Sequence, residues 1–223
     1  MANFRTHFAV ASVGGAAVAQ AGWQAGQWSG WQAMTVAALV AFGGILPDID
    51  ADQSQAIRLI FHILAIIAVV LAVMVLQHKV TPAYLFVACG GVYIGIRYLA
   101  SALFARFTVH RGLWHSLLAA AVSGLSTTAI SFSLLSQSER LAWIHGLALT
   151  LGFVIHLTLD ELYSVDLTGA RLKRSFGTAL KLFSWQAPGS ALMLALVSAH
   201  LLGWLPSFSA LRQLVEQSLA LWH

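Results

Sequence analysis

Charged side chains are scarce in this chain. Only 9% of its 223 residues are Asp, Glu, Lys or Arg, and 59% are hydrophobic, whereas about a quarter of the residues in a soluble domain are charged. A fold of this size cannot hide that much apolar surface from water, so the composition excludes an ordinary water-soluble enzyme. The same composition excludes an intrinsically disordered chain, which is typically poor in apolar residues.

Cysteine is nearly absent as well. The single residue, Cys89, excludes an internal disulfide framework and a zinc site built on thiolates. Because Cys89 lies in an apolar run, we interpret it as a small core residue or a lipid-facing one.

Basic residues outnumber acidic ones and give a formal net charge of +4. They are scattered along the chain, apart from a cluster between Arg171 and Lys181. Basic loops on the cytoplasmic side commonly produce such an excess in membrane proteins. We therefore expect no nucleic-acid partner.

Long stretches without charge divide the chain into candidate membrane helices. A bilayer-spanning helix needs about 20 mostly apolar residues, and we expect such helices over residues 57–77, 82–105, 113–135, 141–162 and 186–204. The N-terminal run is interrupted by glutamines and glycines, which predicts two shorter helices, 7–20 and 32–46. The sequence thus predicts an all-α polytopic membrane bundle of about seven helices, forming one domain over residues 1–223.

Both ends of the chain have features of their own. Arg5, the apolar run that follows it and Ala19-Gln20-Ala21 also fit a secretory signal peptide with a cleavage site, although we favour a retained first helix. Residues 206–223 predict a short amphipathic helix at the membrane interface.

Side chains that can bind metals fall in four short motifs. These are Thr6-His7, Leu46-Pro47-Asp48-Ile49-Asp50, His110-Arg111-Gly112-Leu113-Trp114-His115-Ser116 and His156-Leu157-Thr158-Leu159-Asp160-Glu161. His156 and Asp160 are four residues apart, so on a helix they lie on one face, one turn apart. Asp48 and Asp50 point to the same side if their segment is extended. Each motif alone is more often structural than functional. Their placement together favours a functional role for all four.

Following the chain through seven crossings places these motifs at one membrane face. Ionisable groups at membrane depth are costly and are functional by default. Most basic residues, including Arg58 and the 171–181 cluster, fall on the same side, which the positive-inside rule makes cytoplasmic. The candidate ligands that collect there are His7, Asp48, Asp50, His110, His115, His156 and Asp160.

The ligand types indicate which metal to expect. Imidazole and carboxylate without thiolate favour Zn²⁺, with Mn²⁺ or Fe²⁺ as alternatives, and the ligands suffice for two ions. Two ions could hold the attacking and leaving oxygens of a phosphoester. Arg111, Arg171, Lys173 and Arg174 are candidates for binding an anionic substrate. The cluster around Arg171 fits an interfacial segment held by anionic lipid head groups equally well.

Taken in order, the motifs T-H, L-P-D-I-D, H-R-G-x-x-H-S and H-L-x-x-D resemble those of the YdjM-like family of membrane-bound metal-dependent hydrolases. That family is similar, distantly, to zinc-dependent phospholipase C. The resemblance covers residues 7 to about 160. Two features depart from it: Trp114 stands where a small or hydroxyl residue is expected, and residues 161–183 are longer and more basic. The resemblance implies that metal is bound by His7, Asp48, Asp50, His115, His156 and Asp160, with Arg111 and Ser116 close to the substrate.

These inferences together predict an integral inner-membrane hydrolase that cleaves a phosphoester or related bond of a lipid, or of another anionic substrate, through a metal-activated water. Asp50, His115 and Glu161 are the expected catalytic residues, with Glu161 as general base, and the site is expected to face the cytoplasm. Two alternatives stay open. One is a transporter or channel with His and Asp in its ion pathway, and the other is a non-catalytic scaffold with a structural metal.

Overall fold

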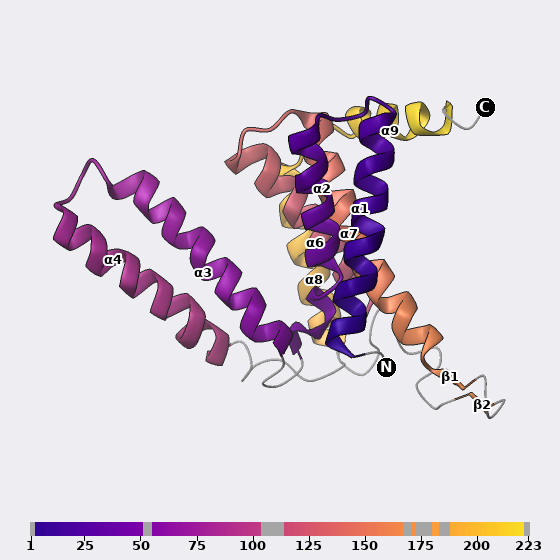
Figure 1. Cartoon of the computed structure of the whole chain (residues 1–223), viewed down its shortest axis with the longest axis horizontal. Helices are drawn as coiled ribbons and strands as arrows, with labels where there is room; N and C mark the ends of the chain where they lie inside the picture. Colours follow the sequence, from indigo (N-terminus) through magenta and orange to yellow (C-terminus); the bar gives the residue numbers. More distant parts are fainter. Residues whose placement is uncertain are drawn as a thin grey trace. The chain divides into compact units, whose positions relative to one another are not determined.

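The computed structural model describes residues 3–50, 55–103, 114–166, 171–172, 180–182 and 188–220. The chain divides into two compact units (Figure 1). Met1–Pro47 and Leu113–His223 form the first, called here the main unit, and Asp48–Gly112 form the second, called the hairpin unit.

The main unit is a helical bundle arranged around α7. Helix α7 contacts α1, α2, α6 and α9, while α1 pairs with α2 and α6 pairs with α8 (Figure 1). Two short strands, β1 (Val165–Asp166) and β2 (Arg171–Leu172), form an antiparallel pair after α7. The helices are α1 (Phe4–Gln24), α2 (Gly30–Gly43), α6 (Leu117–Ala129), α7 (Glu139–Leu162), α8 (Pro188–Leu201) and α9 (Phe208–Ala220).

The helices of the main unit begin where the sequence offers capping side chains. Asn3 Oδ1 accepts a hydrogen bond from the backbone N–H of Thr6 at 2.9 Å at the start of α1. Ser29 and Gln32 form a capping box at the start of α2, and Ser138 caps α7. Such side chains satisfy backbone N–H groups that have no partner within the first helical turn.

Glycines allow the first two helices and α7 to approach closely. A methyl group on Gly15 would lie 2.8 Å from the carbonyl oxygen of Ala37, and one on Gly152 would lie 1.9 Å from that of Val40. Small residues at such crossings are typical of membrane helices. The helix predicted over residues 7–20 is present but longer, since α1 runs from Phe4 to Gln24. Gly14 and Gly15 lie at its contacts with neighbouring helices.

The last part of the main unit bends sharply. Segments Leu192–Trp204 and Phe208–Leu219 meet at 93° after the short 3-10 helix η4 (Leu202–Trp204), so α9 lies across α8 (Figure 1). The Trp143 indole N–H donates to the carbonyl of Ser207 at 3.1 Å, which ties this bend to α7. The predicted C-terminal helix is confirmed, and its apolar side includes the exposed Val215 and Leu219.

The hairpin unit consists of α3 (Gln55–Leu76) and α4 (Pro82–Ile94), the latter continued by the π-helical η2 (Gly95–Ala100). Pro82 occupies the first turn of α4, where its missing N–H has no cost. His62 Nδ1 and the Tyr93 hydroxyl, 2.8 Å apart, join the two helices. The short 3-10 helix η1 (Leu46–Asp50) begins in the main unit and ends in the hairpin unit.

Within the described part of the chain, four helical segments are long and apolar enough to cross a membrane: Gln55–Leu76, Pro82–Leu103, Leu117–Leu134 and Glu139–Leu162. The bent pair Leu192–Trp204 and Phe208–Leu219 makes a fifth if it counts as one span, and Gly30–Gly43 is a shorter apolar helix. Apart from β1 and β2, the regular structure of the described residues is helical, which confirms the all-α part of the predicted fold class. Seven crossings remain a prediction.

Candidate metal centre

The C-terminal end of α7 carries the first two side chains of the site. His156 and Asp160 lie one turn apart, with His156 Nε2 3.6 Å from Asp160 Oδ2. Both side chains are buried, at 0% and 2% exposure. The spacing of four residues therefore has the effect predicted from the sequence, which is to place an imidazole and a carboxylate side by side on one helix face.

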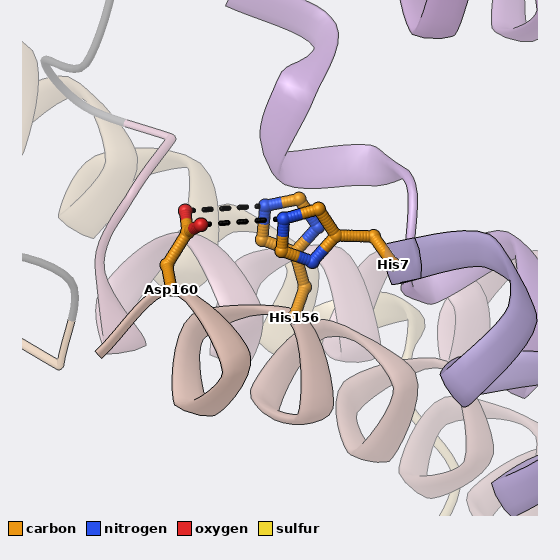
Figure 2. A group of neighbouring side chains, drawn as sticks. All are labelled: His7, His156 and Asp160. Atoms are coloured by element: carbon orange, nitrogen blue, oxygen red, sulfur yellow. Dashed lines mark ion pairs between the residues drawn. The ribbon is translucent and has the colours of Figure 1, made fainter. Parts of the chain in front are cut away.

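The third side chain comes from the first turn of α1. His7 Nε2 lies 3.2 Å from Asp160 Oδ1, and the ring of His7 stacks on that of His156 with centroids 3.6 Å apart and planes 11° from parallel. Figure 2 shows the two rings one behind the other, both directed at the carboxylate of Asp160. The three residues offer ligand atoms that all lie within 4.8 Å of one another.

The fourth side chain comes from the segment that leads into α6. His115 Nε2 lies 3.7 Å from Asp160 Oδ2, and its ring makes an edge contact with His156 at a centroid distance of 5.8 Å. The next residue, Ser116, is the N-cap of α6 and accepts the backbone N–H of Ala119 at 3.2 Å. The cap fixes the start of α6 and with it the position of His115.

One backbone group sets the tautomer of His156. Its Nδ1 lies 2.7 Å from the carbonyl oxygen of Gly44, which only accepts hydrogen bonds, so Nδ1 carries a proton. In the neutral ring Nε2 is then unprotonated and presents a lone pair to Asp160. A second ring nitrogen held by a backbone carbonyl is the usual arrangement around a metal-binding histidine.

Close helix contacts bring the Gly44 carbonyl to this position. A methyl group on Gly44 would lie 2.2 Å from the Ala11 Cβ, and one on Gly152 would lie 2.9 Å from the backbone nitrogen of Gly44. Only residues without a side chain allow α1, the end of α2 and α7 to meet this closely. The pair Gly43-Gly44 and Gly152, one turn before His156, therefore belong to the support of the site.

The distances between the three rings and the carboxylate of Asp160 are longer than those of ordinary charge-assisted hydrogen bonds. Charge-assisted N–H···O bonds are about 2.7–2.9 Å long, whereas the imidazole–carboxylate distances here are 3.2, 3.6 and 3.7 Å. Among the described residues, both oxygens of Asp160 and Nδ1 of His7 have no hydrogen-bond partner although they are buried. Buried polar atoms without partners are rare, and a cation beside the Nε2 atom of His7 would satisfy the carboxylate of Asp160.

A comparison with known protein families decides the affiliation of the chain. The model of the YdjM inner membrane protein family matches residues 1–180. The chain belongs to the YdjM inner membrane protein family. No curated protein and no solved structure matches it. The matched region contains all four side chains of the cluster and ends before α8 and α9.

Membership in the YdjM family agrees with the apolar helices of both units, and the protein is a membrane protein. The predicted ligands His7, His115, His156 and Asp160 are brought together in the main unit. Asp48 and Asp50 lie in η1 at the start of the hairpin unit. Because η1 is a 3-10 helix, the prediction of an extended segment for this aspartate pair is wrong.

The structure describes only some of the other predicted site residues. Glu161 follows Asp160 in the last turn of α7 and is half-buried, and Arg171 begins β2. His110, Arg111, Lys173 and Arg174 lie outside the described residues. The Gly44 carbonyl and Gly152 were not predicted from the sequence. The only signal for them was a pair of glycines directly before the L-P-D-I-D motif and a glycine four residues before His156.

Proposed function

We propose that the cluster of His7, His115, His156 and Asp160 binds a divalent metal ion, with Zn²⁺ as the best fit. The observation that carries the proposal is the convergence of three buried imidazoles on one buried carboxylate at 3.2, 3.7 and 3.6 Å. Nitrogen and oxygen ligands about 2.1 Å from one tetrahedral zinc ion lie about 3.4 Å from each other. The three distances from the imidazole nitrogens to the carboxylate of Asp160 are close to this value.

We further propose that this member of the YdjM family is a metal-dependent hydrolase acting on a phosphoester or related bond of a lipid or another anionic substrate. A bound divalent ion supplies Lewis acidity, which polarises the substrate and acidifies a water molecule. Glu161 adjoins the cluster and is the candidate to accept a proton. Arg111 and the basic residues near 171–174 are the candidates to hold the anionic group, because guanidinium and ammonium groups bind phosphate.

The membrane location favours a lipid as substrate. His7 lies in the first turn of α1 and Asp160 in the last turns of α7, so the cluster lies at helix ends rather than halfway along the bundle. At such a level a head group can approach from the membrane surface. The excess of basic residues near these helix ends is the basis for proposing that this face is cytoplasmic.

Metal content tests the first part of the proposal. Purified wild-type protein is expected to retain zinc after dialysis, and His156→Ala and Asp160→Asn should each lose it. The double variant should bind little less metal than either single variant, because neighbouring ligands of one ion are not additive. His145→Ala is the matched control on the same helix and should keep its metal. Full occupancy in both ligand variants, monodisperse in detergent, would refute the metal centre.

Turnover tests the second part. The metal-loaded protein is screened for release of phosphate or of a phosphorylated head group from phospholipids and lipid phosphates. Glu161→Gln should keep the metal and lose turnover, by a factor of about 10²–10⁴ if Glu161 acts as the general base. Bound metal without hydrolysis of any ester or phosphoester would instead establish a structural ion.

A further inference from the structure

The main unit contains a second buried polar pair, at a distance from the metal centre. Ser131 Oγ and His145 Nδ1 are 2.7 Å apart, and the two residues are 2% and 7% exposed. His145 and His156 are both on α7 and are separated by about 16 Å along the helix axis at about 1.5 Å per residue. The pair therefore plays no part in the proposed metal site.

The backbone around Ser131 is unusual. Ile130–Leu134 form the π-helical turn η3, and π-helical turns are rare and are often found at functional sites. Ser136, just beyond it, has a φ of 52°, a left-handed conformation that non-glycine residues seldom adopt. The backbone N–H of Gln137 returns to the carbonyl of Ser131 at 3.0 Å, which closes this turn.

Hydrogen bonding determines which nitrogen of His145 carries the proton. Within the described part of the chain, the hydroxyl of Ser131 bonds only to His145 Nδ1, and the buried Nε2 of His145 has no partner. If Nδ1 donated, both the hydroxyl proton and the Nε2 lone pair would be unsatisfied. If the hydroxyl donates to Nδ1, only one group remains without a hydrogen-bond partner, and that group is the N–H donor at Nε2. The pair therefore holds a buried donor that requires an acceptor.

The residue that carries this donor lines a cleft. Its volume is about 290 Å³, and His145 lines it together with Gln32, Thr35 and Gln137. The Gln32 Oε1 accepts the backbone N–H of Ser29, which leaves the Gln32 NH₂ group as a further donor. An acceptor-bearing ligand matches this lining.

A second, apolar groove adjoins the cleft, and Trp31 lines both. The groove has a volume of about 490 Å³ and runs between α1 and α2 over the small residues Ala16, Ala19, Ala33 and Ala37. Trp23 and Trp31, which border it, are 52% and 80% exposed. Exposed tryptophans are enriched at the level of the membrane interface, where the ester groups of phospholipids lie.

We propose that the cleft and the groove together form a binding site for a diacyl phospholipid. An ester carbonyl oxygen accepts the hydrogen bond of His145 Nε2–H, and one acyl chain follows the apolar groove beside Trp31. The site is separate from the metal centre and does not depend on it.

Native mass spectrometry of the full chain in detergent tests this proposal with two lipids. The probes are dioleoyl phosphatidylethanolamine and its diether analogue, which has the same head group and chains but no ester carbonyl. The wild-type protein should bind the diester about 3- to 10-fold more tightly, the factor expected for one hydrogen bond. His145→Phe should abolish this preference, while His78→Phe, in an exposed turn of the hairpin unit, should retain it. Equal binding of both lipids by the wild type would overturn the proposal.

A second variant covers the case in which His145→Phe does not fold. Trp31→Ala changes an exposed side chain and should weaken binding of both lipids, because Trp31 lines both the cleft and the groove. The control is Phe86→Ala in the hairpin unit, since Phe86 is 81% exposed and borders neither of them. Unchanged lipid binding in Trp31→Ala, or the same loss in Phe86→Ala, would show that the site is not here.

Discussion

At the scale of the residue, His7 has two contacts that can be separated by substitution. Its ring stacks on His156, and its Nε2 faces Asp160 at 3.2 Å. In His7→Phe the aromatic ring can still stack, but the nitrogen is lost. We expect the thermal stability of the metal-free protein to change little and the bound zinc to fall sharply, as measured by elemental analysis after dialysis.

His7→Ala removes both the ligand nitrogen and the stacked ring. His7→Ala should lose both the metal and about 2–4 kcal/mol of stability, because it also leaves a cavity beside His156. If His7→Phe bound zinc as the wild type does, His7 would be a packing residue, and the ion would depend on the other three side chains alone.

The sequence predicts the ligand side chains of the cluster but not the backbone group that holds them in place. A ligand side chain is visible in the sequence, and the helical period places His156 beside Asp160. The Gly44 carbonyl also belongs to the arrangement, since it lies 2.7 Å from His156 Nδ1, yet every residue has a carbonyl, so no residue type marks it. What selects Gly44 is the close contact of three helices, which the local sequence does not specify.

At the scale of the element, Gly152 controls how α2 and α7 meet. A methyl group there would lie 1.9 Å from the Val40 carbonyl oxygen, so the helices must separate in Gly152→Ala. The Gly44 carbonyl would then move away from His156 Nδ1. We expect a loss of about 1–3 kcal/mol of stability from overpacking and about 10-fold or more in zinc affinity from the altered support of His156.

A matched glycine provides the control for this effect. A methyl group on Gly91 in α4 would meet no atom within 4 Å, so Gly91→Ala should stabilise its helix by about 0.5–1 kcal/mol and leave the metal unchanged. Zinc titration and thermal unfolding of both variants measure the two quantities. Unaltered zinc affinity in Gly152→Ala would mean that the Gly44 contact is not needed to orient His156.

Some helices of the structure could be predicted from the sequence and others could not. Apolar runs gave α3, α6 and α7 within a few residues, because a membrane helix is specified by composition and length. Glycine has low helix propensity in isolation, yet Gly14 and Gly15 lie within α1. In the bundle they are contact points, and burial against α2 and α7 outweighs that propensity. The π-helical turns η2 and η3 have no sequence signature and were not predicted.

At the scale of the whole molecule, the course of the chain through the membrane follows from α7, α8 and α9. Helix α7 ends at the candidate metal centre, and α8 packs beside α6 before the chain bends by 93° into α9. If α8 crosses the membrane and α9 lies along its surface, the β1–β2 segment and the C-terminus are on opposite faces. If the bent pair is a re-entrant loop instead, both are on the same face.

Cysteine labelling distinguishes these two courses, because the chain has only one cysteine to remove, Cys89. In a Cys89→Ala background, single cysteines are introduced in place of Thr168 and after His223, and each is treated with a membrane-impermeant maleimide in intact cells and in inverted vesicles. The excess of basic residues predicts that the face of residue 168 is cytoplasmic, so we expect the cysteine at 168 to react only in inverted vesicles. The C-terminal cysteine should react only in intact cells whose periplasm is open to the reagent. Reaction of both from one side would make the α8–α9 pair re-entrant. Reaction of the cysteine at 168 from the periplasmic side would place the metal centre there, and its substrate would then have to be a lipid of the outer leaflet.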